Sequence, residues 1–123
     1  MKNKPIIIIA GEPYSIFSEI LIKSLKKYSV KKPIIIIGSF DLIKNQINKL
    51  GYNFRPKKIN FNNKIKNTKF NLSKINIIDV NFKYKKIFDK ISKISNKYIF
   101  ECFRLAIDIS KKINVAGIIN GPN

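Results

Sequence analysis

Few side chains of this 123-residue sequence could do chemistry, because it contains no histidine and only one cysteine. A Ser-His-Asp triad, a Cys-His pair and an imidazole metal site all need histidine, and a cysteine zinc cluster needs more than one thiol. A single cysteine also excludes an internal disulfide bond. Chemistry in this chain would therefore use carboxylates, lysine, tyrosine or backbone amides, or it would need residues that the chain does not have.

Two carboxylates lie at or near the end of the first apolar run, residues 5–10. Gly11, Glu12 and Pro13 follow this run directly, and Glu19 comes one helical turn into the next periodic stretch. Ligands of open α/β sheets bind beyond the carboxyl ends of the strands, so these four residues are candidates for a substrate or cofactor cleft. A carboxylate there could position substrate or a metal-binding group. Alternatively, Glu12 lies in a solvated turn and Glu19 complements the helix dipole.

A second candidate loop follows the last apolar run, residues 115–119. Asn120, Gly121 and Pro122 come directly after it. If this run is a strand parallel to the first, these residues lie at the same edge of the sheet and line the same cleft. The alternative is a turn that merely ends the strand. We predict no metal ligand and no catalytic residue in this chain.

Other reactive groups favour structural roles. Cys102 lies on an apolar helical stripe with no base or metal to activate it, which predicts a buried thiol and not a nucleophile. Glu101 and Asp108 are seven residues apart and so share one helix face, where solvated charge is the simpler interpretation.

The elements that position these residues alternate along the chain. Short, uninterrupted apolar runs predict buried strands at residues 5–10, 34–37, 75–80 and 115–119. Helical spacing predicts helices over residues 15–28 and 39–50, with Ser15 and Ser39 as N-caps and Gly51 just past the second. A long helix starts between residues 83 and 95, and its apolar stripe consists of Ile94, Tyr98, Cys102, Leu105 and Ile109.

Strands that are apolar on both faces belong to parallel sheets covered by helices. We therefore predict an α/β fold, a parallel-stranded α/β/α sandwich, as a single domain over residues 1–123 in which the last strand is central. Residues 52–73 predict irregular structure with one short edge strand near residues 59–61. The first apolar run is too short for a signal segment and no run could span a membrane, so we expect a cytoplasmic protein without a membrane partner.

The formal net charge of +18 suggests a polyanionic partner at first sight. However, Ile, Lys and Asn supply 27, 23 and 15 residues, whereas Arg, which recognises phosphate best, supplies two. This bias is typical of an A- and T-rich gene, so we do not expect nucleic acid as the partner. The alternative function is a small basic α/β RNA-binding module, and a third is a decayed remnant. The alternative depends on lysines interleaved with aromatic residues: Lys57, Lys58, Phe61, Lys64, Lys66, Phe70, Phe82, Lys83, Tyr84, Lys85 and Lys86.

Three segments, in order, resemble the 4-hydroxythreonine-4-phosphate dehydrogenase family. Residues 5–19 resemble its opening strand and Gly-Asp/Glu-Pro turn, although Ser15 and Phe17 stand where the family has glycines. Residues 75–80 are similar to its third well-defined strand. Residues 96–122 resemble its helix and the strand that leads to a Gly-Pro or Ala-Pro turn.

The resemblance implies the N-terminal part of an isocitrate and isopropylmalate dehydrogenase-like fold, in a homodimeric enzyme of pyridoxal phosphate biosynthesis. It implies oxidation of a phosphorylated hydroxy-amino acid by NAD, followed by decarboxylation. It also implies a divalent metal held by histidines, and these lie beyond residue 123. We therefore expect this chain to be the beginning of a longer enzyme, to bind neither NAD nor metal alone and to be inactive alone.

Overall fold

Five strands form one sheet in the computed structural model, which describes residues 4–28, 31–61 and 75–121. The sheet order is β3-β4-β2-β1-β5, and every neighbouring pair is parallel. The strands are β1 (Ile6–Ile9), β2 (Ile34–Gly38), β3 (Lys57–Ile59), β4 (Asn76–Asp79) and β5 (Gly117–Asn120). The helices are α1 (Phe17–Lys27), α2 (Phe40–Lys49), the 3₁₀ turn η2 (Lys93–Ser95) and α3 (Asn96–Lys112).

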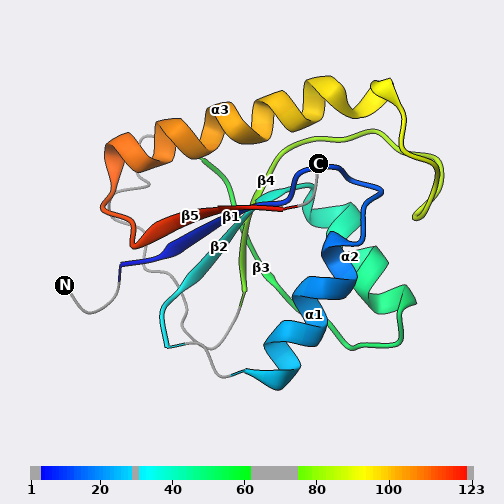
Figure 1. Ribbon diagram of the computed structural model, residues 1–123, viewed down its shortest axis with the longest axis horizontal. Helices are drawn as coiled ribbons and strands as arrows, with labels where there is room; N and C mark the ends of the chain where they lie inside the picture. Colours follow the sequence, from blue (N-terminus) through cyan, green and yellow to red (C-terminus); the bar gives the residue numbers. More distant parts are fainter. Residues whose placement is uncertain (1–3, 29–30, 62–74, 122–123) are drawn as a thin grey trace.

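Helices cover both faces of the sheet, which confirms the predicted α/β class. Figure 1 shows α3 on one face and α1 with α2 on the other. Alternate residues of β2 divide between the two layers: Ile35 and Ile37 pack with α3, whereas Ile34 and Ile36 pack with α1 and α2. All five residues of β2 are buried, as a strand covered on both faces requires.

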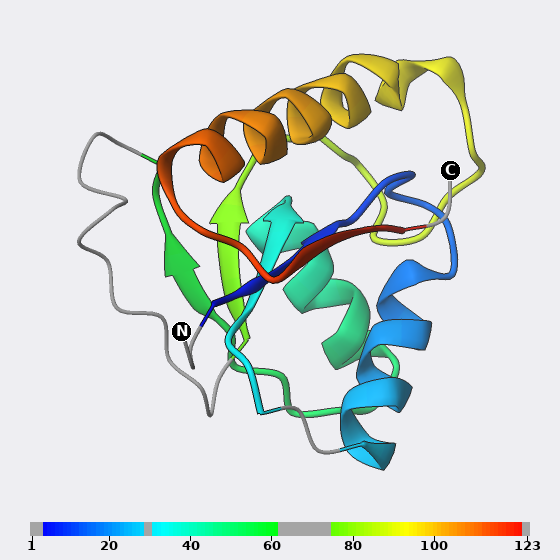
Figure 2. The same cartoon turned by 60° about the vertical axis from the view of Figure 1, so that its left-hand side comes forward.

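β5 lies at the edge of the described sheet, so the prediction of a central last strand is wrong for this part of the chain. Figure 2 shows β5 alongside β1. The two strands pair in a register that sets Ile119 beside Ile8. Ile118 is 45% exposed and Ile119 is 53% exposed. The apolar character of these two side chains predicted burial on both faces of the strand. In the described sheet, however, β5 has a neighbouring strand on one side only, and both side chains stay about half exposed.

The predicted helix ends are partly confirmed. Ser39 caps α2 by accepting a hydrogen bond from the Leu42 amide, and Gly51 follows that helix with a φ of 98°. Ser15 is not the N-cap of α1, which begins at Phe17 after Ile16. The Ser15 hydroxyl instead accepts from the Phe17 amide at 3.2 Å, within the turn that precedes the helix.

The long helix begins at Asn96, one residue after the predicted window, because the residues before it form the 3₁₀ turn η2. Ile94 belongs to that turn and is 81% exposed, so its placement on the buried stripe was wrong. The other four residues of the stripe are buried. The short edge strand is confirmed as β3, although it covers Lys57–Ile59 and begins before the predicted segment.

Candidate functional site

The turns after β1 and β5 meet at the carboxyl edge of the sheet. The Gly121 amide donates to the Ile9 carbonyl at 2.7 Å. A Cβ atom on Gly121 would lie 2.4 Å from the carbonyl oxygen of Ala10, so only glycine allows this approach. Gly11 has a φ of 76° where the chain leaves β1. The structure thus brings the two predicted loops together, although Pro122 lies outside the described residues.

Glu12 is buried at this edge, with 5% of its surface exposed, so the alternative of a solvated turn is wrong. One carboxylate oxygen accepts from the Ser95 hydroxyl at 2.9 Å, and the other accepts from the Tyr14 amide at 3.4 Å. Ser95 is the last residue of η2, so the carboxylate joins the turn after β1 to the start of α3. This side chain holds two parts of the candidate site in place.

Glu19 has a different environment from Glu12. It lies in the first turn of α1 and pairs with Lys23, one turn later, at 2.6 Å. Both side chains of this pair are largely exposed. The structure therefore gives Glu19 the solvent-facing position that the alternative interpretation predicted, where an acidic side chain also complements the helix dipole.

Residues 80–92, which we call the crossing segment, connect β4 to η2 without a helix or a strand. Figure 1 shows this segment running past the carboxyl ends of the strands toward α3. The Tyr14 hydroxyl donates to the Lys86 carbonyl at 2.9 Å. Tyr84 donates to Asp41 on α2 and accepts from Asn45 at 3.1 Å. The crossing segment is therefore fastened both to the turn after β1 and to α2.

Gln46 is a central residue of this edge that the sequence analysis missed. Its amide nitrogen donates to the carbonyls of Pro13 and Ile87, each at 2.9 Å. Its amide oxygen accepts from the Ser18 hydroxyl at 2.6 Å. The sequence offered one indication that Gln46 is buried: it follows Leu42 by four residues, which places it on the buried face of α2.

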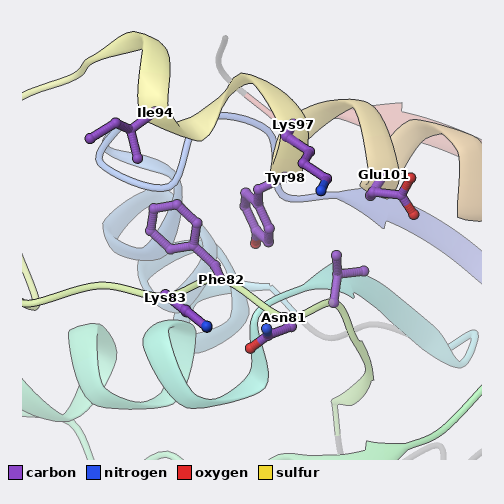
Figure 3. A pocket seen from close by; sticks show the side chains of 8 residues that line it. Asn81, Phe82, Lys83, Ile94, Lys97, Tyr98 and Glu101 are labelled. Atoms are coloured by element: carbon purple, nitrogen blue, oxygen red, sulfur yellow. The ribbon is translucent and has the colours of Figure 1, made fainter.

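A cleft of about 470 Å³ lies between the crossing segment and α3. Its residues are Val80, Asn81, Phe82, Lys83, Ile94, Lys97, Tyr98 and Glu101. Figure 3 shows the rings of Phe82 and Tyr98 together, with Lys97 and Lys83 on either side of them. The ring centroids are 4.8 Å apart. The apolar floor lies beside two ammonium groups, which would attract a small anion, and beside the Glu101 carboxylate, which would repel it.

The ionisable groups beneath this cleft favour their neutral forms. Burial raises the pKa of Tyr98 well above its usual value, although the Ser39 amide, which donates to the phenolic oxygen at 2.7 Å, opposes the shift. Burial also raises the pKa of the Cys102 thiol to about 12. A thiol that stays protonated is a poor nucleophile, which agrees with the structural role predicted for Cys102.

The acidic residues on α3 are solvated, as predicted. Arg104 bridges Glu101 at 2.9 Å and Asp108 at 3.1 Å. This contact holds the pKa of Glu101 below its usual value, with Arg104 as the main cause. Exposed pairs of this kind contribute little to stability or chemistry.

The aromatic residues interleaved with lysine pack within the molecule where the structure describes them. Phe82 lies 6.0 Å from Tyr14 and 6.4 Å from Tyr84, centroid to centroid. The Lys112 ammonium lies 5.0 Å from the ring centroid of Phe61. Lys64, Lys66 and Phe70 lie outside the described residues. The described rings therefore contact other groups of this chain.

Residues 4–28, 31–61 and 75–121 contain no group of three or more His, Cys, Asp or Glu side chains that could hold a metal ion. A metal of the kind that the sequence resemblance implies does not fit the side chains described. In the same ranges, no helix is long and apolar enough to cross a membrane.

Solved structures of similar fold are dehydrogenases. One, assigned as a 4-hydroxythreonine-4-phosphate dehydrogenase from Salmonella typhimurium, superposes with a TM-score of 0.76 at 20% identity, over 98% of this chain and 37% of its own. The 4-hydroxythreonine-4-phosphate dehydrogenase from Klebsiella pneumoniae gives 0.72 at 22% identity, over 98% and 37%. That from Burkholderia phymatum gives 0.74 at 18% identity, over 98% and 36%.

These comparisons confirm, at the level of the fold, the family resemblance predicted from the sequence. No protein-family model and no curated protein sequence matches the chain. The chain spans little more than a third of the length of the dehydrogenases it resembles, which is consistent with an N-terminal portion.

Proposed function

We propose that this chain is the N-terminal segment of an NAD-dependent oxidoreductase similar to 4-hydroxythreonine-4-phosphate dehydrogenase. The observation that carries the proposal is the superposition of 98% of the chain on little more than a third of such an enzyme. The whole enzyme would oxidise and then decarboxylate a phosphorylated hydroxy-amino acid in pyridoxal phosphate biosynthesis. It would work as a homodimer in the cytoplasm.

In this proposal the chain shapes one wall of the cleft and does not carry the catalytic groups. Gly11, Glu12 and Pro13 from one turn and Asn120 and Gly121 from another would form that wall, because both turns lie at the carboxyl edge. Pro122 would continue the second turn. Glu19 would lie at its outer margin, since it already pairs with Lys23 in solvent.

The metal and NAD sites would lie mainly in the remainder of the enzyme. Histidine is absent from this sequence, and the described acidic side chains do not form a metal-binding cluster. When bound, NAD would supply the hydride acceptor. The contribution of this chain would be to hold the substrate turn rigidly, through Glu12 and Ser95 on one side and Gln46 on the other.

The test compares the 123-residue chain with a longer protein. NAD reduction is followed with 4-phosphohydroxythreonine and a divalent metal, first with the chain alone and then with the longest in-frame product of its gene. We expect turnover only from a product that carries the remainder of the fold. Turnover by the 123-residue chain alone would refute the placement of the catalytic residues, and a folded longer product without turnover would refute the assigned reaction.

The RNA-binding alternative makes a separate prediction. Contacts between lysine and phosphate weaken steeply as salt concentration rises, because bound counterions are released. If the net charge of +18 is incidental, retention on RNA disappears near physiological ionic strength. Specific retention that persists there would favour the RNA-binding module over the enzyme segment.

A further inference from the structure

The end of β5 and the turn after it contain the only Asn-Gly pair of the sequence, Asn120-Gly121. The backbone nitrogen of the residue that follows an asparagine can attack the side-chain carbonyl carbon and close a five-membered succinimide ring. A side chain on that following residue hinders the attack, and glycine has none. Every other asparagine that has a following residue is followed by one with a side chain. Asn120 is therefore the asparagine of this chain that is most prone to deamidation.

The fold exposes the side chain of Asn120 but holds the nitrogen that would attack it. The Asn120 side chain is open to solvent. The Gly121 amide donates to the Ile9 carbonyl at 2.7 Å. Gly121 also lies so close to the carbonyl oxygen of Ala10 that an added Cβ would be 2.4 Å from it. The nitrogen has to lose its proton and turn toward the side chain before it can react, and these two contacts oppose both steps.

The strand conformation of Asn120 opposes ring closure as well. Asn120 is the last residue of β5 and pairs with Ile9 of β1. In a parallel strand ψ is about +115°, which directs the next backbone nitrogen along the strand, whereas side chains stand roughly perpendicular to the sheet. Ring closure needs that nitrogen beside the side-chain carbonyl carbon. Asn120 can therefore reach the reactive geometry only after the end of β5 has left β1.

We propose that Asn120 is a deamidation site that the pairing of β5 with β1 keeps closed and that detachment of β5 opens. In the detached strand, the Gly121 nitrogen forms a bond to Cγ of Asn120. The bond from Cγ to Nδ2 breaks, and ammonia leaves with the proton of the Gly121 amide. Water then opens the ring at one of its two carbonyl carbons, which leaves either aspartate or isoaspartate. Neither step depends on the oxidoreductase reaction proposed above.

The isoaspartate product holds the end of β5 away from β1. Its main chain runs through the former side chain, so one additional carbon lies between the Cα of residue 120 and the Gly121 nitrogen. The contacts of Gly121 with Ile9 and Ala10 leave no space for that carbon. Both products also place a negative charge at the carboxyl edge of the sheet, beside the turn after β1. Deamidation through isoaspartate thus converts a reversible detachment of β5 into a permanent one.

The experiment compares the 123-residue chain with a free peptide of residues 113–123 at the same pH and temperature. This peptide is the fragment that trypsin releases after Lys112, so mass spectrometry measures conversion at Asn120 in both samples on the same sequence. Labelling by an isoaspartyl methyltransferase identifies isoaspartate. Asn114 is the internal control, because it is exposed in the same fragment but is followed by Val115.

We expect Asn120 to convert at least about tenfold more slowly in the folded chain than in the peptide, which corresponds to an opening free energy of roughly 1.4 kcal/mol. Asn114 should stay unmodified in both samples. Hydrogen exchange supplies a second measurement on the wild type. The Gly121 amide exchanges only when its bond to Ile9 opens, so the fold should slow deamidation at least as much as it slows this exchange.

Two matched variants separate detachment of β5 from unfolding of the whole chain. Val115 precedes β5 and Val80 begins the crossing segment, and both are partly buried against the core cluster beneath α3. Val115→Ala and Val80→Ala therefore remove the same methyl groups from the same cluster. Val115→Ala should speed conversion at Asn120 at least about threefold more than Val80→Ala, because it loosens the attachment of β5 itself. Circular dichroism checks that both variants are folded.

Four results would overturn the proposal. The first is that Asn120 converts no faster than Asn114 in the free peptide. The second is that the folded chain converts at Asn120 as fast as the peptide does. The third is that the fold slows deamidation less than it slows exchange of the Gly121 amide. The fourth is that the two valine variants speed conversion equally, which would assign the event to unfolding of the whole chain.

Discussion

Gln46 offers the sharpest test of how the carboxyl edge is held. The change is Gln46→Glu, which keeps the size and shape of the side chain but replaces the amide nitrogen with an oxygen. In the wild type this nitrogen donates to the carbonyls of Pro13 and Ile87, and the residue is only 2% exposed. A carboxylate cannot donate at pH 7, so both carbonyls lose their partner and face a negative charge.

The magnitude follows from these two contacts. Each buried acceptor left without a donor costs about 1–3 kcal/mol, so the variant should lose about 2–6 kcal/mol of unfolding free energy. The bond from the Ser18 hydroxyl, 2.6 Å in the wild type, survives because a carboxylate oxygen also accepts. Because the loss falls on the crossing segment and the turn after β1, hydrogen exchange should rise there before it rises in β2.

The assay is urea unfolding followed by circular dichroism, with Asn48→Asp as the matched control. Asn48 lies on the same helix, is exposed, and accepts from the Phe54 amide at 3.0 Å, which a carboxylate can also do. The control makes the same change of charge without removing a buried donor, so it should stay within about 0.5 kcal/mol of the wild type. Equal stability of the two variants would show that the Gln46 contacts do not hold the edge.

Three further predictions use the same equilibrium measurement. Gly121→Ala should lower the free energy of unfolding by about 1–3 kcal/mol, because the added Cβ would lie 2.4 Å from a backbone carbonyl oxygen. Gly117→Ala has open space around the added Cβ and should cost less. Equal effects of the two changes would contradict the close approach at Gly121. Ser95→Ala should cost about 1–3 kcal/mol in the wild type but much less beside Glu12→Ala, which removes the oxygen that accepts from the Ser95 hydroxyl. An additive cycle would argue against the coupling. Folding raises the pKa of Cys102 from 9.0 to about 12. The stabilisation that this shift provides is therefore complete below pH 9 and is lost as pH rises toward 12. Cys102→Ala should lose less stability than the wild type over that interval, and parallel pH profiles would refute this.

The local elements were largely predictable because their causes are local. The isoleucine runs of β1 and β2, the hydroxyl cap at Ser39 and the glycine at position 51 each act within a few residues. The errors have local causes as well. Ile94 fits the helical period of α3, but the preceding 3₁₀ turn rotates it out of the stripe. The helical spacing of apolar residues does not show where the 3₁₀ turn ends and the α-helix begins.

The candidate site was only partly predictable, because its contacts join distant segments. The sequence placed Glu12 at a strand end, but not its burial against Ser95, which is 83 residues away. The helical spacing from Leu42 placed Gln46 on the buried face of α2, but it did not indicate the partners Pro13 and Ile87, which lie far away on either side of it in the chain. Such contacts depend on how the turn, α2 and the crossing segment meet in space.

Composition and periodicity by themselves indicated an α/β protein that contains no histidine. Three segments in order, residues 5–19, 75–80 and 96–122, carried the resemblance to the beginning of a dehydrogenase. Only the tertiary structure decided which strand is left at the edge. The apolar residues of β2 and β5 look equally suited to burial, yet β2 has neighbours on both sides and β5 has one. Burial depends on the order of strands across the sheet, and that order is set by packing between segments that the sequence places far apart.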